Sequence, residues 1–416
     1  MFTSLIDPAF LANPYRSYQA LREAGPIHWN TEFCGGAWLL TSYSDVASAL
    51  RDPRFSAQRT GGWVNGSGPE ALAELREFKR IFSRSLVFLN GAQHTRLRQV
   101  MNVGFKPAAI EAMRPRIQSI VDGLIDRIGG QQHFDFMREL ARPLPAMVMA
   151  DMMAVDDADQ ADFFAWSDDI AAFIGSPTPT LDIARRAQTG LLALTDYFRA
   201  LLPERRRKPG TDLVSQLILA ESEGGIITSK QLLAQCSTLL FAGHETTRNL
   251  LGNGIYALLS RPAQWQQLQL NPAGIPLALK ELLRFDSPVQ YTGRRVLVDT
   301  ELHGQLLKRG DLVIPLIGSA NRDPAKFKQP DTLQLDRAEG NHLSFGYGPH
   351  VCIGATLTYL EAEIAFQTIL RRLPHLQLVD TPPQWGTNAV YRGLTSLPMH
   401  LATAPANYLP QPSAYA

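Results

Sequence analysis

Cysteine, net charge and long apolar runs are all scarce in this chain. Its 416 residues include 3 cysteines, and no two of them are close in sequence. This spacing excludes a disulfide framework and a zinc ribbon, and it fits a reducing compartment. Lys and Arg number 40 against 39 Asp and Glu, for a net charge of +1. Such a chain has no overall field that attracts polyanions, so we expect neither nucleic acid nor a membrane as a partner.

The first residues, Met-Phe-Thr-Ser-Leu-Ile-Asp-Pro, lack the basic start and the apolar core of a signal peptide or membrane anchor. We therefore expect a cytoplasmic protein, and a monomer is the default expectation. Hydrophobic residues make up 45% of the chain, which is enough for a large core. The tail over residues 404–416 is rich in Pro and Ala and is expected to be poorly ordered.

The segment Phe345-Gly-Tyr-Gly-Pro-His-Val-Cys-Ile-Gly354 carries the clearest chemical signal. It places Cys352 after a glycine-rich loop and before a helical pattern over 355–370. Backbone N–H groups and the helix dipole favour an anion at that point, so we expect a lowered thiol pKa and a thiolate at neutral pH. A lone cysteine is more often a small buried apolar residue, which is the interpretation we prefer for the other two cysteines.

The spacing Phe-x-x-Gly-x-His-x-Cys-x-Gly resembles the haem-binding loop of the cytochrome P-450 family without a departure. The resemblance implies a haem b (iron protoporphyrin IX) whose iron is bound by the Cys352 thiolate, the metal-ligating residue. The loop would lie against the haem, with an aromatic ring shielding the sulfur and a histidine reaching a propionate. The expected cofactor contacts from this loop are Phe345, Gly346, His350, Cys352 and Gly354.

Two further stretches match positions that hold the haem propionates in this family. His94 and Arg98 are four residues apart and share one helix face. Taken alone, such a pair is usually part of a solvated face, and the resemblance assigns it to the propionates. Arg294 corresponds to the family's propionate-binding arginine. Its neighbour Arg295 would point to the opposite face of a strand.

The second chemical stretch is Leu239-Leu-Phe-Ala-Gly-His-Glu-Thr-Thr247. Glycine followed by acidic and hydroxyl side chains is costly in mid-helix, and by itself the pattern favours a bulged core helix with an exposed glutamate. The order Ala-Gly-x-Glu-Thr, however, matches the oxygen-activation motif of the family. The resemblance implies that Ala242 and Gly243 lie against the haem at a local widening of the helix. It makes Glu245 and Thr246 the catalytic pair that supplies protons.

A third motif is Lys280-Glu-Leu-Leu-Arg284, on a helix before Ser287-Pro288. An exposed Glu/Arg pair is common on any helix, whereas on a buried face neither charge is tolerated without a partner. The family adds an arginine from a later segment to this pair, and Arg337 is our candidate. We expect the trio to support the thiolate loop structurally, with no catalytic role.

Together the motifs cover residues from about 14 to 400 in the order found in the family. They imply the cytochrome P-450 fold, mainly α with a small β-rich lobe, and haem between a long helix at 228–260 and the Cys352 loop. We expect a single domain over 1–416, which overrules the two or three domains that length alone favours.

By resemblance the protein is a haem-thiolate monooxygenase, an oxidoreductase that uses dioxygen as co-substrate for hydroxylation of a largely apolar small molecule in secondary metabolism. No flavin or dinucleotide fingerprint and no cysteine cluster is present, so electrons should come from another protein. The resemblance implies that this partner is a ferredoxin with its NAD(P)H-dependent ferredoxin reductase. Two alternatives stay open. One is a haem-thiolate enzyme that is driven by peroxide or that couples or rearranges its substrate, and the other is a non-catalytic haem sensor.

The substrate itself is not identified by the sequence. Val289 and Gln290, with Leu394 and Thr395 in a late hairpin, are expected to border it by family position alone. Apolar residues in and around 60–90 and 165–190 indicate an apolar molecule.

Overall fold

The computed structural model describes residues 4–33, 35–59, 73–176, 179–226 and 228–402. The expected disordered tail at 404–416 therefore lies outside the described residues. No helix within these ranges combines the length and apolarity that crossing a bilayer requires.

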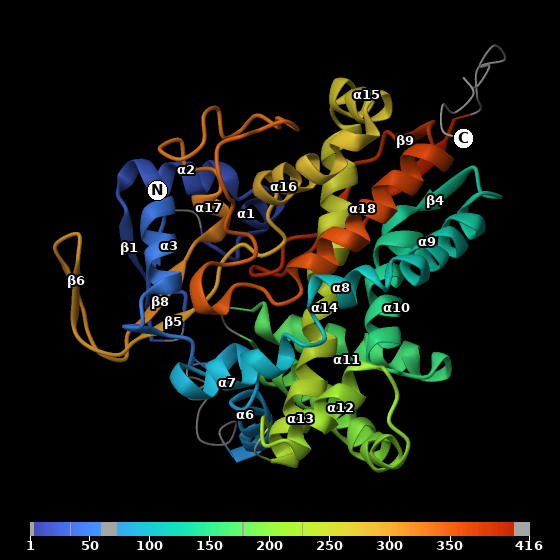
Figure 1. The fold of residues 1–416 in the computed structure, drawn as a ribbon. Coiled ribbons are helices and arrows are strands. Elements are labelled where there is room, and N and C mark those ends of the chain that lie inside the picture. Colours follow the sequence, from blue (N-terminus) through green and yellow to red (C-terminus); the bar gives the residue numbers. More distant parts are fainter. Residues whose placement is uncertain (1–3, 34, 60–72, 177–178, 227, 403–416) are drawn as a thin grey trace.

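Helices dominate the described chain, and Figure 1 shows most of them on the side of the molecule away from strands β1, β5 and β8. Short 3-10 segments lie at Leu86–Phe88, Asp157–Asp159, Pro272–Gly274 and Gly348–His350, and a π-helical turn lies at Met137–Ala141. The α-helices are α1 (Pro8–Ala12), α2 (Tyr15–Ala24), α3 (Tyr43–Arg51), α6 (Arg76–Phe82), α7 (Gly91–Met101), α8 (Pro107–Glu111), α9 (Arg114–Ile128), α10 (Pro143–Met152), α11 (Gln160–Ile174), α12 (Leu181–Arg207), α13 (Leu213–Ser222), α14 (Ser229–Leu259), α15 (Pro262–Leu270), α16 (Ile275–Phe285), α17 (Ile317–Ala320) and α18 (Ala355–Arg372).

The strands form small sheets. The largest has the order β1-β2-β8-β5-β3, in which β2 and β8 are parallel and the other neighbours are antiparallel. A three-stranded sheet has the order β4-β12-β9, and β10-β11 and β6-β7 are hairpin-like pairs. The strands are β1 (Ile27–Asn30), β2 (Ala37–Leu40), β3 (Phe55–Ser56), β4 (His133–Asp135), β5 (Arg294–Val296), β6 (Thr300–Leu302), β7 (Gln305–Leu307), β8 (Leu312–Pro315), β9 (Leu376–Leu378), β10 (Gln384–Trp385), β11 (Leu394–Ser396) and β12 (Pro398–Leu401).

The two faces of the five-stranded sheet are both buried. Because successive side chains on a strand point to opposite faces, Leu39 and Leu40 enter different apolar clusters. The Leu39 cluster contains Phe10 and Tyr18 from α1 and α2, and the Leu40 cluster contains Val46 from α3. A much larger apolar cluster unites the helices of the other lobe. The apolar clusters thus separate a small β-rich lobe from a larger helical lobe, which confirms the mainly helical architecture expected from the sequence.

The long helix α14 is uninterrupted from Ser229 to Leu259. It begins where the Thr228 hydroxyl accepts a hydrogen bond from the Gln231 N–H, a typical N-cap. Most of its side chains are buried, as expected for a helix that passes between other layers rather than over the surface. The local widening expected around Ala242 and Gly243 is not seen, since the helix there is regular α.

Candidate functional site

Two adjoining cavities border α14, and one of them lies between this helix and the Cys352 loop. The first, which we call the thiol cavity, has a volume of about 280 Å³ and is lined by Cys352, Phe345 and His350 among others. The second, the outer cavity, has a volume of about 210 Å³ and is lined by Phe33 and Tyr291 among others. They share part of their walls, so they lie side by side. The shared residues are Arg59, Ala242, Thr246, Val289 and Thr292.

Cys352 is held at the start of α18 by its own backbone, because its N–H donates to the Phe345 carbonyl at 2.8 Å. The thiol is accessible from the thiol cavity that it lines. Burial by the surrounding protein raises its pKa, which the N–H groups of Gly354 and Ala355 and the charge of Arg98 only partly oppose. The expected lowering is therefore absent in the protein alone. A thiol that coordinates a metal ion is deprotonated by the metal itself.

The loop before Cys352 needs glycine at two places. Gly346 and Gly348 have φ of +74° and +76°, in the left-handed region that side chains disfavour. A Cβ at Gly348 would also lie 3.0 Å from Cα of Arg51 in α3. Gly354 differs, because a Cβ there would make only ordinary contacts at 3.9 and 4.0 Å. Packing between protein atoms thus does not explain Gly354.

His94, on α7, and His350 meet at the edge of the thiol cavity. Their ring centroids are 4.0 Å apart, and His94 Nε2 is buried without a hydrogen-bond partner. Burial and the neighbouring charges of His94 and of three arginines lower the pKa of His350 to about 3. Burial and Arg98 lower the pKa of His94. Both shifts favour the neutral imidazole, which carries one N–H donor.

Two arginines line the same cavity without a carboxylate partner among the described residues. Arg98 donates to the carbonyl of Val351 at 2.6 Å, and Arg294 donates only to the carbonyl of Gly293 at 2.9 Å. Burial and the charge of Arg59 lower the pKa of Arg294 to about 9. Buried cations and an orphaned imidazole nitrogen are costly unless an anion is close to them. This donor set fits a flat group with carboxylates at its edge and a metal above Cys352.

The face of α14 that meets the site contains Ala242 and Thr246, which are four residues apart. Gly243 has a different neighbour, since a Cβ there would lie 2.4 Å from Sδ of Met149 in α10. The direction of a side chain at Gly243 is thus filled by Met149, and Gly243 is not among the residues that line either cavity. In a regular helix adjacent residues point in different directions, so only one of the two neighbours Ala242 and Gly243 can face the cavities.

Glu245 is 5% exposed, is not among the residues that line either cavity, and belongs to a cluster of charged residues from α14 and α11. Its carboxylate pairs with Arg248 and lies 3.4 Å from the Asn249 amide nitrogen. Arg248 also lies 3.8 Å from Asp168, whose carboxylate pairs with Arg142. The chain of charges thus leads from a buried glutamate to the half-exposed Asp168 and Arg142.

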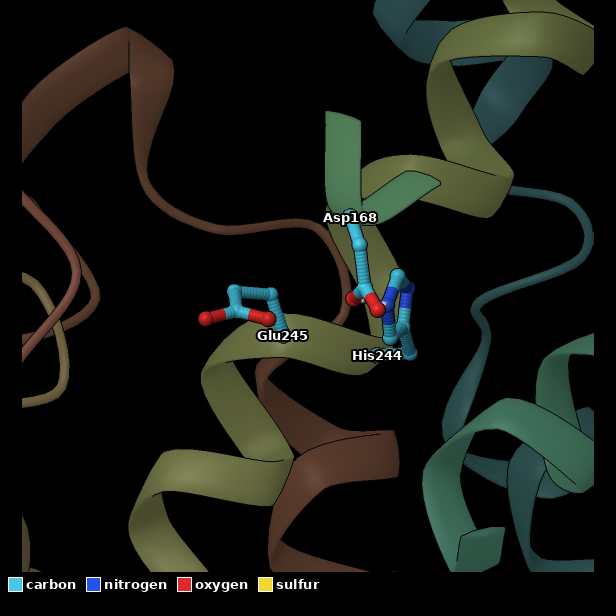
Figure 2. Close-up of side chains that lie close together, drawn as sticks. All are labelled: Asp168, His244 and Glu245. Atoms are coloured by element: carbon cyan, nitrogen blue, oxygen red, sulfur yellow. Dashed lines mark ion pairs between the residues drawn. The ribbon is translucent and has the colours of Figure 1, made fainter. Parts of the chain in front are cut away.

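Figure 2 shows the Asp168 carboxylate next to the His244 ring, with Glu245 at the adjoining position of α14. The potential ligand atoms of these three residues lie within 4.8 Å of one another. Both carboxylates already pair with guanidinium groups, so a further cation would meet two positive charges. Burial would raise the pKa of Asp168, but contacts with His244, Arg142 and Arg248 outweigh it and the pKa is lowered.

Of the residues expected to border a substrate, the structure brings only Val289 to the cavities. Gln290 is buried and its amide nitrogen donates to the carbonyl of Ser287 at 2.7 Å. Leu394 is in the apolar core, and the Thr395 hydroxyl donates to the carbonyl of Gln384. None of these three is among the residues that line either cavity.

The sequence interpretation missed several residues that line the outer cavity. Val390 and Tyr391 reach it from the segment just before β11, and Ser176 reaches it from just after α11. Ile174 at the end of α11 also lines it, and it lies in the 165–190 stretch that was expected to contribute apolar pocket residues. Tyr291 lies two residues beyond Val289, and this strand-like spacing was the one available signal. Arg59 was also missed, because nothing in its local sequence separates it from a surface arginine.

Comparison with known proteins bears on this geometry. The family model for cytochrome P450 matches residues 57–271 and 275–395. The chain is 36% identical to the cytochrome P450 monooxygenase PikC of Streptomyces venezuelae, with 94% of this chain and 91% of PikC covered. It is 35% identical to the polyketide biosynthesis cytochrome P450 PksS of Bacillus subtilis, with 94% and 97% covered.

A solved structure shares the fold of this chain. The crystal structure of the myxobacterial cytochrome P450 CYP267B1 in complex with myristic acid superposes with a TM-score of 0.88 at 32% identity. The match covers 97% of this chain and 100% of that one. Family model, relatives and fold agree over nearly the whole chain. The protein therefore belongs to the cytochrome P450 family and is an oxidoreductase of the monooxygenase type.

Proposed function

We propose that this protein is a haem-thiolate monooxygenase that hydroxylates an apolar small molecule in the outer cavity, and that the thiol cavity holds haem b. The observation that carries this proposal is the thiol cavity itself. It places one thiol at a helix start and gathers histidines and arginines that lack an acidic partner among the described residues. Cys352 would bind the iron, and the propionates would be held by His94, Arg98, Arg294 and His350. A haem with a thiolate ligand supplies the activation of dioxygen.

The roles of Thr246 and Glu245 follow from where their side chains lie. Thr246 lines the wall shared by both cavities, so its hydroxyl can donate and accept a proton beside the reacting atoms. Glu245 is held by Arg248, and it must be released from that pair before its carboxylate can take up a proton. Asp168 lies 3.8 Å from the same guanidinium and offers it an alternative partner. We expect this exchange to connect the buried glutamate with solvent.

The substrate class is supported by the outer cavity, whose walls are mostly aliphatic and aromatic. PksS is named for polyketide biosynthesis, and CYP267B1 was solved with myristic acid. A role in secondary metabolism is the corresponding proposal for this chain. We further propose a ferredoxin and its NAD(P)H-dependent reductase as the electron source, because the sequence carries neither a flavin fingerprint nor a cysteine cluster.

The test of haem ligation is the absorption spectrum of the reduced protein with carbon monoxide. We expect the strongly red-shifted band of a thiolate-bound haem in the native protein and its loss in Cys352→Ser. Cys236→Ser is the matched control, since that thiol is fully buried in α14 and burial raises its pKa to about 12. An unshifted band in the native protein, or an unchanged band in Cys352→Ser, would contradict the proposal.

A further inference from the structure

Arg59 is a cation on the wall that the two cavities share. One guanidinium nitrogen donates to the carbonyl of Ala57 at 3.2 Å, and the guanidinium carbon lies 4.8 Å from the centre of the Phe88 ring. Among the described residues, no carboxylate forms an ion pair with it. Enclosure by the protein lowers its pKa to about 10, so the group stays positively charged at neutral pH.

The stem of Arg59 is packed in place. A Cβ at Gly293 would lie 2.8 Å from Cδ of Arg59, so the side chain lies directly over the backbone of that glycine. The ring of Phe88 supports the guanidinium by a cation–π contact. An arginine fixed in this way loses little freedom when it binds a ligand, which favours binding.

The haem does not require this third arginine. Haem b carries two propionates, and Arg98 and Arg294 line the thiol cavity together with two histidines. Neither of these arginines lines the outer cavity, whereas Arg59 lines both. Arg59 also lowers the pKa of Arg294, which shows that the two cations are close enough to repel each other. A second anion near Arg59 would offset that repulsion.

The rest of the outer cavity fits the apolar body of an anionic ligand. Its lining contains no Asp or Glu among the described residues, and it includes Arg295, whose guanidinium donates to the carbonyl of Gly310. The hydroxyl of Tyr291 is buried there without a hydrogen-bond partner. The remaining wall is largely apolar, with Phe33, Ile174, Leu312, Ile314 and Val390.

We propose that Arg59 is a specificity-determining residue that binds a carboxylate of the substrate, so that the enzyme selects apolar molecules carrying one carboxylate group. The proposal rests on the proposed function, because it takes the outer cavity as the substrate site. A guanidinium pairs with a carboxylate through two parallel hydrogen bonds, which a neutral alcohol of the same length cannot reproduce.

The test compares acids with alcohols on the haem-loaded enzyme. Decanoic, myristic and palmitic acids are titrated beside the alcohols of equal chain length, and Kd is measured from the haem spectrum and by isothermal titration calorimetry. We expect the native enzyme to bind at least one acid more tightly than its alcohol. Arg59→Met should raise the Kd of that acid by about tenfold to a hundredfold, the range expected for the loss of charged hydrogen bonds. The Kd of the alcohol should change by less than about threefold.

Two further variants complete the design. Arg59→Lys keeps the charge and should retain part of the preference for the acid. Arg295→Met is the matched control, and its effect on the acid should be smaller, because its guanidinium is engaged by Gly310.

The proposal is overturned if Arg59→Met weakens the binding of acid and alcohol equally, or if the native enzyme binds no acid more tightly than its alcohol. Loss of haem from Arg59→Met overturns it as well, since the residue would then hold a propionate. The reduced carbon monoxide spectrum is recorded for every variant. A native protein without the red-shifted band would refute the proposed function, and the calorimetric comparison of acid with alcohol would still decide the role of Arg59.

Discussion

In two helices of the described chain a buried glutamate pairs with an arginine three residues further on, and the two pairs have opposite surroundings. Glu281 and Arg284 lie on α16, and Glu245 and Arg248 lie on α14. In both pairs the glutamate is at most 5% exposed. Since the spacing and the burial of the glutamate agree, the differences between the pairs come from what the rest of the chain places around each arginine.

The pair on α16 is closed. Arg284 makes two hydrogen bonds of 2.7 Å to Glu281, and Arg337 adds two more at 3.1 and 3.0 Å, as the sequence predicts. The backbone N–H of Gln334 donates to the same carboxylate, and the carbonyls of Asn321 and Pro330 accept from Arg284. Within the part of the chain that the structure describes, Arg284 pairs with no acid other than Glu281, and its other hydrogen bonds end on backbone carbonyls, so this pair is rigid.

The pair on α14 is open at one end. Arg248 is the main partner of Glu245. The Arg248 guanidinium also lies close to a second acid, Asp168, which is itself paired with the half-exposed Arg142. An arginine between two acids can exchange one for the other at small cost. The comparison teaches that a glutamate and an arginine three residues apart can form a rigid structural pair or an exchangeable one. Which of the two they form depends on how completely their hydrogen bonds are satisfied within the protein.

The largest expected effect is on stability, at the closed cluster. Glu281→Gln leaves Arg284 and Arg337 buried without their anion, and we expect the free energy of unfolding to fall by about 3–5 kcal/mol. Urea unfolding and haem content measure the effect. The control is Glu339→Gln, which removes a partly exposed partner of Arg337 and should cost less than about 1 kcal/mol. A cost for Glu281→Gln as small as that of the control would remove the distinction between the two pairs.

Substitution in the Glu245–Arg248 pair should change catalytic activity rather than stability. Glu245→Gln keeps the shape and leaves Arg248 with Asp168, so we expect little change in substrate Kd. Product formation should drop by about a hundredfold or more, the contribution of a positioned proton donor. The measurement is product formed per electron consumed, with a solvent isotope effect that rises in the variant. A variant that turns over like the native enzyme would show that the carboxylate carries no proton.

The smallest expected effect is at Asp168, and it depends on pH. Because its folded pKa lies below the ordinary value, its charge contributes stability above about pH 4, and this is lost as pH falls through the folded pKa. Asp168→Asn lacks this contribution, so its Tm should be lower than native near neutrality, with the gap closing in acid. Thermal unfolding between about pH 3 and 7 measures the gap. The control is Asp169→Asn on the same helix, because within the described chain Asp169 forms an ion pair with Arg186 alone.

The sequence by itself determined the local features of this protein. The spacing around Cys352 predicts a loop that ends in a helix, and Gly346 and Gly348 have the positive φ that this loop needs. The pattern over 228–260 predicts α14, and the spacing of Glu281 and Arg284 predicts a pair on one helix face. The third member, Arg337, was expected from the resemblance to the family and not from spacing. These predictions succeed because residues three or four apart must share a helix face, whatever the rest of the chain does.

Only the tertiary structure decided what each of these features touches. It placed Met149 against Gly243, Asp168 beside Arg248, and Arg59 between two cavities, and it replaced Leu394 and Thr395 by Val390 and Tyr391 at the cavity wall. It also raised the pKa of Cys352, since burial there outweighs the helix start. Each of these outcomes depends on packing between segments that are distant in sequence, and no local spacing encodes which distant side chain arrives or how much water it excludes.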